Sequence, residues 1–209
     1  MKYNRIDNYG PNEENPLVEG ETLLHQVKPK KNAFILNQAL PMAPFALLWL
    51  AFDSAFIIGM TAGGVFKEQP MILLFIIPFF AIHMMPVWIW LANVLTANKK
   101  WQNTEYYVTD KRIIIKNGLF ASNYQTIYYK EIQGVDLRVG LADKLLGVGD
   151  VYLKLNDGGS TAFFDIEAAQ EIYVKLQKIV LDIQTDVEYP NALRPESNPG
   201  YNTKYEPKE

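Results

Sequence analysis

Two titratable side chains stand alone inside long apolar stretches of this sequence. Asp53 is the only charged residue from Asn32 to Phe66, and His83 is the only titratable one from Gln69 to Asn98. A carboxylate and an imidazole suit either a proton- or ligand-responsive pair or a structural hydrogen bond. Counted from the segment between the stretches, Asp53 is about nine residues deep and His83 about thirteen, an offset of roughly 6 Å along a helix. We favour the structural role, because one polar pair is too few for a transport path.

Other patterns that carry chemistry are missing from the sequence. It has no cysteine and only two histidines, His25 and His83, so neither a thiolate site nor a His-rich metal site is expected. No histidine follows residue 101, which excludes a Ser-His-Asp triad from that half of the chain. Gly147-Val148-Gly149 is not a phosphate loop, because Tyr152 stands where a third glycine is needed and no Walker lysine follows. We therefore predict a non-enzymatic protein without catalytic residues, metal or cofactor.

The two apolar stretches have the length of membrane-spanning helices. Roughly 20 residues of helix cross the hydrocarbon core of a bilayer. The sequence predicts spans at about 39–62 and 71–95, within a transmembrane hairpin at 32–98. Gly63-Gly64 and Pro70 are expected to form its tight connection. Pro78 and Pro86 lie inside the second stretch, where each removes a backbone hydrogen bond, so we expect a bend there.

Lysines predict the orientation of this hairpin. Three precede it and two follow it, whereas the connection holds only Lys67, offset by Glu68. Cytoplasmic loops are enriched in Lys and Arg. We therefore predict a multi-pass protein of the cell (plasma) membrane with both termini in the cytoplasm and the lipid bilayer as its first partner. The five flanking residues are Lys28, Lys30, Lys31, Lys99 and Lys100.

The pattern changes after Trp101 to short β-branched and aromatic segments separated by turn residues. Six such segments predict a compact antiparallel β-domain at 99–184. The final segment of this domain, from Glu167 to Ile183, repeats apolar residues every three or four positions, which predicts an amphipathic helix with Asp165 as its N-cap. Polar, proline-containing ends at 1–31 and 185–209 are predicted to be disordered. The six segments are TEYYVT, KRIIIK, NYQTIYYK, GVDLRV, VYLKLN and STAFFDI.

Charge gives little support for nucleic-acid or strong headgroup binding. The net charge is −3, so nucleic acid is not an expected partner. Residues 99–182 hold eleven basic and eleven acidic side chains. Lys111, Arg112 and Lys116 are the candidate headgroup contacts near the first hairpin of the β-domain. We favour the alternative, an ordinary charged hairpin in which Arg112 pairs with a carboxylate.

Three motifs resemble the bacterial pleckstrin-homology-like membrane proteins of the YdbS type. They are NTEYYVTDKRIII from Asn103, IYYKEIQGV from Ile127 and LLGVGDV from Leu145. The lead-in GETLLHQVKP also resembles that family. Its recurrent Tyr, Thr and Arg match Tyr106, Thr109 and Arg112. The resemblance covers roughly residues 20–182 and implies a PH-like fold and a membrane location, with no assigned activity.

Together these observations predict an α+β membrane protein: a two-helix transmembrane hairpin followed by a PH-like antiparallel β-domain with a C-terminal helix. The predicted function is a non-enzymatic, membrane-anchored interaction or scaffold module at the cytoplasmic face. Its partner is a protein or a second copy of the chain, with residues 141–146 as a candidate contact unless they pack under the sheet. The alternative is a membrane-embedded component of a transport or envelope-stress complex that uses Asp53 and His83.

Overall fold

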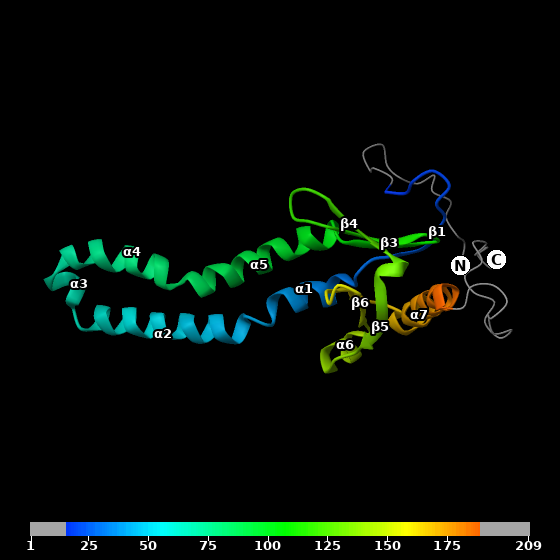
Figure 1. The fold of residues 1–209 in the computed structure, drawn as a ribbon. Coiled ribbons are helices and arrows are strands. Elements are labelled where there is room, and N and C mark those ends of the chain that lie inside the picture. Colours follow the sequence, from blue (N-terminus) through cyan, green and yellow to red (C-terminus); the bar gives the residue numbers. More distant parts are fainter. Residues whose placement is uncertain (1–15, 189–209) are drawn as a thin grey trace. The chain divides into compact units, whose positions relative to one another are not determined.

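The structure is a computed structural model that describes residues 16–188 (Figure 1). The chain forms two compact units. One runs from Phe34 to Gln102, and the other combines the residues up to Ala33 with those from Asn103 onward. We call the first the helical hairpin and the second the β-domain. The predictions for residues 1–15 and 189–209 lie outside the described residues.

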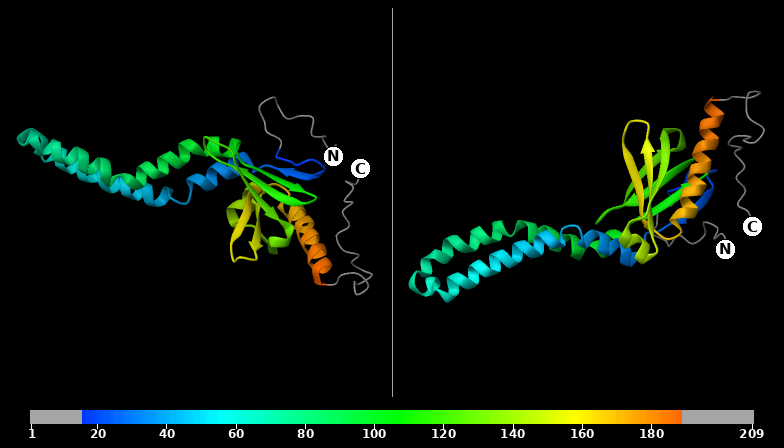
Figure 2. Two further views of the ribbon diagram at one scale, coloured as in Figure 1. Left: turned by 45° about the horizontal axis from the view of Figure 1, so that its top comes forward. Right: turned by 90° about the horizontal axis from the view of Figure 1, so that it is seen from below.

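The helical hairpin has two long legs, visible in Figure 2. Its elements are α1 (Lys31–Ala39, which begins at the edge of the β-domain), α2 (Ala43–Ala62), α3 (Val65–Glu68), the 3-10 turn Pro70–Ile72, α4 (Leu73–His83) and α5 (Met85–Gln102). Pro44 lies in the first turn of α2, where a missing N–H costs little. Gly64 has a φ of 76°, a left-handed conformation that favours glycine and separates α2 from α3.

The second leg is bent, as Pro78 and Pro86 predicted. The segments Pro70–His83 and Met85–Gln102 meet at 51°. Pro78 stays inside α4, and the break falls at Met84, two residues before Pro86. Because Pro86 has no N–H, the regular helical ladder is interrupted there. The N–H groups of Val87 and Trp88 both donate to the carbonyl of Met84 at the start of α5.

The β-domain contains two antiparallel sheets. The first has the strand order β1-β2-β3-β4 and the second β5-β6-β7. All six predicted segments form strands, and a 3-10 turn separates the two sheets in sequence. The elements are β1 (Leu23–Val27), β2 (Glu105–Thr109), β3 (Arg112–Asn117), β4 (Asn123–Tyr128), the 3-10 turn Tyr129–Glu131, β5 (Ile132–Arg138), α6 (Leu141–Leu146), β6 (Gly149–Leu155) and β7 (Ser160–Ile166).

The segment before the hairpin differs from the sequence-based expectation. Residues 1–31 were predicted to be a disordered lead-in, but β1 adds a fourth strand to the first sheet by pairing with β2. The isolated bridge between Pro29 and Ile166 then joins this segment to β7. Only Leu24 of β1 is buried, so its sequence carries no clear alternation. Hydrogen bonding to β2 decides the structure of this segment.

The C-terminal helix α7 (Ala169–Glu188) completes the core. Its apolar face packs with both sheets in one buried cluster, as the repeat of apolar residues predicted. Asp165 is not its N-cap, because β7 continues through Asp165 to Ile166 and α7 begins only at Ala169. The buried residues of this face are Ala169, Ile172, Leu176, Ile179 and Val180.

Candidate functional site

Asp53, which carries the one carboxylate of α2, faces away from the outer surface of the helical hairpin. Asp53 is 1% exposed, whereas its neighbour Phe52 is 66% exposed. The only buried residues of α2 are Asp53 and Ala46. The helix therefore presents large apolar side chains outward and its one carboxylate toward the other leg.

His83 lies opposite Asp53 at the end of α4. Its Nδ1 lies 3.1 Å and 3.2 Å from the two carboxylate oxygens of Asp53. The indole N–H of Trp49, one turn before Asp53, donates to the carbonyl of His83 at 2.8 Å. The break at Met84 explains this second bond, because the Val87 N–H donates to Met84 rather than to His83. Two polar contacts from adjacent turns of α2 thus hold the end of α4.

Aromatic rings surround the His83 imidazole. Phe79 stacks on it at 5.0 Å between ring centroids, and Trp49 lies at 5.0 Å with a tilt of 32°. An ionised Asp53 can accept a hydrogen bond from Nδ1–H of either neutral or charged imidazole. No third titratable side chain occurs in residues 32–66 or 69–98, so these stretches contain no series of groups to relay a proton. The geometry fits a structural contact between the legs.

Substitution of Asp53 should separate hydrogen bonding from charge. Asp53→Asn keeps an acceptor oxygen, and we expect it to retain the hairpin's stability. Asp53→Leu and His83→Leu remove the contact and should each cost about 0.6 kcal/mol, the average for polar bonds between membrane helices. The measurement is denaturation in mixed detergent, followed by tryptophan fluorescence, since Trp49 lies at the contact.

The outward-facing Phe52→Leu is the matched control and should leave the transition unchanged. An Asp53→Asn variant as unstable as Asp53→Leu would show that the ionised carboxylate, and not the bond alone, holds the legs together.

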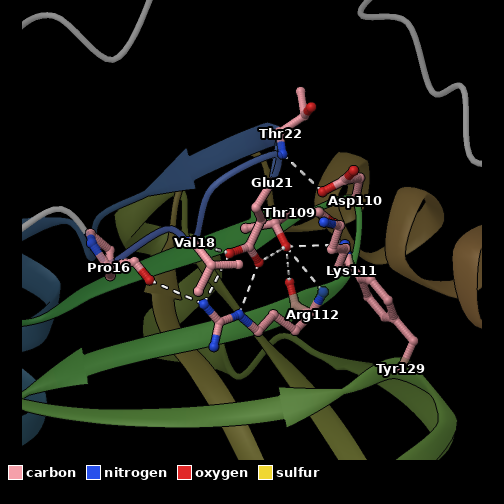
Figure 3. A network of polar contacts seen from close by, with 9 residues as sticks. All are labelled: Pro16, Val18, Glu21, Thr22, Thr109, Asp110, Lys111, Arg112 and Tyr129. Atoms are coloured by element: carbon pink, nitrogen blue, oxygen red, sulfur yellow. Dashed lines mark hydrogen bonds and ion pairs between the residues drawn. The ribbon is translucent and has the colours of Figure 1, made fainter.

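A second polar network lies in the β-domain, where β1 and β2 meet the first residue of β3 (Figure 3). Arg112 Nε donates to Glu21 Oε1, and Nη2 donates to Glu21 Oε2, both at 2.9 Å. The same Nη2 reaches the carbonyl of Pro16 at 3.2 Å. The Thr109 hydroxyl lies 2.8 Å from Glu21 Oε1, and the Val18 N–H donates to Glu21 Oε2 at 2.9 Å. This bidentate pair ties residues 16–21 to the first sheet.

The network shifts the ionisation of both partners. Burial by itself raises the pKa of the Glu21 carboxyl. Hydrogen bonds from Arg112, the Val18 N–H and Thr109, with the charge of Arg112, outweigh burial and lower that pKa below its ordinary value. The hydrogen bond to Glu21 raises the pKa of Arg112 further. Glu21 is thus held as a buried carboxylate with a permanent counter-charge.

This pairing removes Arg112 from the candidate headgroup contacts. The guanidinium donates both to a buried carboxylate and to a backbone carbonyl, so the favoured alternative of a paired arginine describes it. Lys111 directly precedes β3 and Lys116 lies near its other end, five residues or about 16 Å away along a strand. The Lys116 ammonium lies 5.9 Å from the ring centroid of Tyr124. The structure does not bring the three basic residues together.

Tyr106 links the two sheets of the β-domain. Its ring stacks on Phe163 of β7 with centroids 4.5 Å apart and planes 15° apart. Its hydroxyl accepts a hydrogen bond from the Phe164 N–H at 3.0 Å. Burial raises the pKa of this hydroxyl well above its usual range, although the Phe164 bond works in the opposite direction. Tyr106, Thr109 and Arg112, the recurrent residues of the first family motif, therefore make contacts that hold the β-domain together.

Two further surfaces of the β-domain are open. Leu141 and Leu145 of α6 are 88% and 89% exposed, so residues 141–146 do not pack under the sheet. A groove of about 450 Å³ runs along the surface where the edge strand β5 meets α7. In the part of the chain that the structure describes, no group of three or more acidic or histidine side chains is placed to hold a metal. The groove is lined by residues that include Gln133, Val135, Asp136, Val174, Lys178 and Leu181.

The fold is thus an α+β arrangement of antiparallel sheets closed by a C-terminal helix, which is the architecture expected of a PH-like interaction domain. A family model described as "Bacterial PH domain" matches residues 45–180, or 136 of the 209 residues. The chain belongs to this bacterial PH domain family. The matched range includes most of the helical hairpin and leaves out β1. No curated protein and no solved structure matches the chain.

Proposed function

We propose that this protein is a membrane-anchored interaction module: the helical hairpin crosses the bacterial plasma membrane twice and holds the PH-like domain at the cytoplasmic face. The observation that carries the proposal is the surface of α2. Large apolar side chains project from it, while its only carboxylate is buried. Such a surface suits hydrocarbon and is unfavourable in water.

The lengths of the helices support two crossings. α2 has 20 residues, about 30 Å of helix, and is long and apolar enough to span a bilayer. The bent pair Pro70–His83 and Met85–Gln102 qualifies as a second span if both halves belong to one crossing. Proline-broken helices are tolerated in membranes when neighbouring groups satisfy the freed backbone atoms, as Trp49 does for the carbonyl of His83.

Lysines and tryptophans support the orientation. The indole N–H of Trp90 donates to the carbonyl of Ala39 at 3.0 Å, which joins α5 to the end of α1. From this bond, eight residues of helix lead back to Lys31 and nine lead on to Lys99, about 12 to 14 Å in each case. Both basic flanks therefore lie a similar distance beyond the same point, as expected at one cytoplasmic interface.

The proposed mechanism is positional. A tethered domain meets partners at a raised effective concentration on the membrane surface. The groove between the edge strand β5 and α7, lined by both apolar and charged side chains, offers contacts to such a partner. The bacterial PH family match supports an interaction role for the domain. For the Asp53–His83 pair, the contact geometry favours a structural role over a transport role.

Cysteine labelling tests the predicted topology. The chain has no cysteine, so Gln69→Cys in the connection and Ser160→Cys in the β-domain each create a single reactive site. In intact cells, stripped of any outer barrier, an impermeant thiol reagent should label position 69 and leave position 160 unlabelled. After cell lysis, both should react. Labelling of position 160 in intact cells would contradict the proposed anchoring.

A further inference from the structure

Three large apolar side chains of the β-domain project almost entirely into the surroundings. Phe120 is 90% exposed, and Leu141 and Leu145 are 88% and 89% exposed. Among the residues of this unit whose exposure the structure describes, the next most exposed large apolar side chain is that of Leu181, at 56%. In the helical hairpin, the most exposed large apolar side chain is that of Met71, which is 75% exposed. Isolated exposed leucines need no explanation, but side chains extended this far have no packing role in the domain.

The leucines are presented by an ordered element. Leu141 and Leu145 are four residues apart in α6 and so lie on one face. The Asp143 carboxylate accepts the Gly140 N–H at 2.8 Å at the start of α6. Gly147, with a φ of 67°, ends the helix in a left-handed conformation. The exposure of the leucines is therefore a product of the fold and not of a loose chain end.

Contacts inside the β-domain place these side chains beside the points where the hairpin joins it. Lys30, the residue before α1, donates from Nζ to the carbonyl of Leu146 at 3.0 Å. Asn103, the residue after α5, donates from Nδ2 to the carbonyl of Leu119 at 3.2 Å. The end of α6 thus touches one junction, and the β3–β4 turn that carries Phe120 touches the other.

We propose that Leu141, Leu145 and Phe120 insert into the interfacial layer of the same bilayer that the hairpin spans. This inference rests on the proposed membrane anchoring and adds a second, peripheral contact. Lys30, which contacts the end of α6, is itself one of the flanking lysines, and Asn103, which contacts the β3–β4 turn, follows Lys100 by three residues along the chain. Apolar side chains beside basic ones suit the boundary between acyl chains and anionic headgroups. Lys144 lies between the two leucines in sequence, as does Asp143, whose carboxylate accepts the Gly140 N–H. The proposed ligand of this contact is an anionic lipid surface.

The test uses the full chain with one cysteine at a time, labelled with an environment-sensitive fluorophore. Leu145→Cys and Phe120→Cys report on the proposed contact. Phe56→Cys reports on α2, where Phe56 is 51% exposed. Ser160→Cys is the matched control, since it follows the far end of β6, about 20 Å of strand from α6. Each protein is reconstituted into vesicles of phosphatidylcholine and phosphatidylglycerol, with spin-labelled lipid as the bilayer quencher and iodide as the aqueous quencher.

We expect spin-labelled lipid to quench the probes at positions 145, 120 and 56, and iodide to quench the probe at 160. If position 56 is quenched by lipid while 145 and 120 behave like 160, the peripheral contact is wrong and the anchoring stands. If position 56 is not quenched by lipid, the anchoring fails and the inference fails with it. Protection of position 145 from both quenchers would show that protein, from a second copy or from the same chain, covers it, and would overturn the lipid assignment.

Discussion

Arg112→Met should destabilise the β-domain by about 3 kcal/mol, because it leaves the buried Glu21 carboxylate without its counter-charge. The side chain of Glu21 is fully buried and that of Arg112 is 15% exposed. Two hydrogen bonds, from Thr109 and the Val18 N–H, remain to the carboxylate, so the lower end of the range for broken buried pairs applies. Hydrogen exchange of the β2 and β3 amides in the detergent-solubilised full chain measures the loss.

Two controls separate charge from general damage. Lys111→Met changes the adjacent exposed residue and should alter the free energy of opening by no more than about 0.5 kcal/mol. The double variant Glu21→Gln/Arg112→Met removes both charges and should recover part of the loss. An Arg112→Met protein as stable as Lys111→Met would mean that the ion pair contributes nothing to the fold.

Acidification should also destabilise the β-domain, and the direction of this change follows from the lowered pKa of Glu21. That pKa is lowered in the folded protein, so the unfolded state binds more protons in the pH range below the ordinary value of 4.5. The stabilisation is present above 4.5 and is lost as the pH falls through the folded pKa. In the Glu21→Gln variant, the free energy of unfolding should fall less steeply with decreasing pH than in the native protein.

Phe163→Ala should cost about 3–5 kcal/mol, the largest effect expected of a single core truncation here. Phe163 is fully buried in β7 and stacks on Tyr106 of β2, so it joins the two sheets. Its removal leaves a cavity between sheets that are joined largely by such side-chain contacts. Amides of both sheets should lose exchange protection together, which distinguishes this variant from a local defect.

Phe164→Ala is the matched control, since its side chain is 44% exposed and should cost well under half as much. Tyr106→Phe keeps the ring stack but loses the bond from the Phe164 N–H, with an expected cost of about 1 kcal/mol. Protection lost in only one sheet of Phe163→Ala would show that the sheets open independently.

The apolar stretches, the six strands and α7 could be predicted from the sequence because their signals are local. A continuous apolar run, a set of short β-branched segments and a repeat of three or four residues each arise from neighbours along the chain. The bend near Pro86 could also be predicted from a local signal, since a proline lacks a backbone N–H whatever its surroundings. The family resemblance rested on three short motifs, the first of which contains Tyr106, Thr109 and Arg112, and it led to the bacterial PH domain family that the family model shows.

Contacts between distant residues belong to the tertiary structure. Arg112 finds its carboxylate 91 residues earlier in the chain, in a segment whose polar composition predicted disorder. β1 is a strand only because β2 offers an edge to pair with. Residues 141–146 contain three leucines, a composition that fits a buried helix as well as an exposed one, and only the folded domain turns Leu141 and Leu145 outward.

Asp53 and His83, the two isolated titratable residues, show most clearly what the sequence determines and what the tertiary structure decides. The sequence by itself predicted that Asp53 and His83 lie inside apolar helices with depths that differ by roughly 6 Å, because helical rise converts residue counts into depth. It did not determine that they face each other, since that depends on how each helix is rotated about its axis. Packing of the two legs and the break at Met84 set that rotation and bring Nδ1 to 3.1 Å from the carboxylate. Depth follows from counting residues, whereas contact follows only from packing.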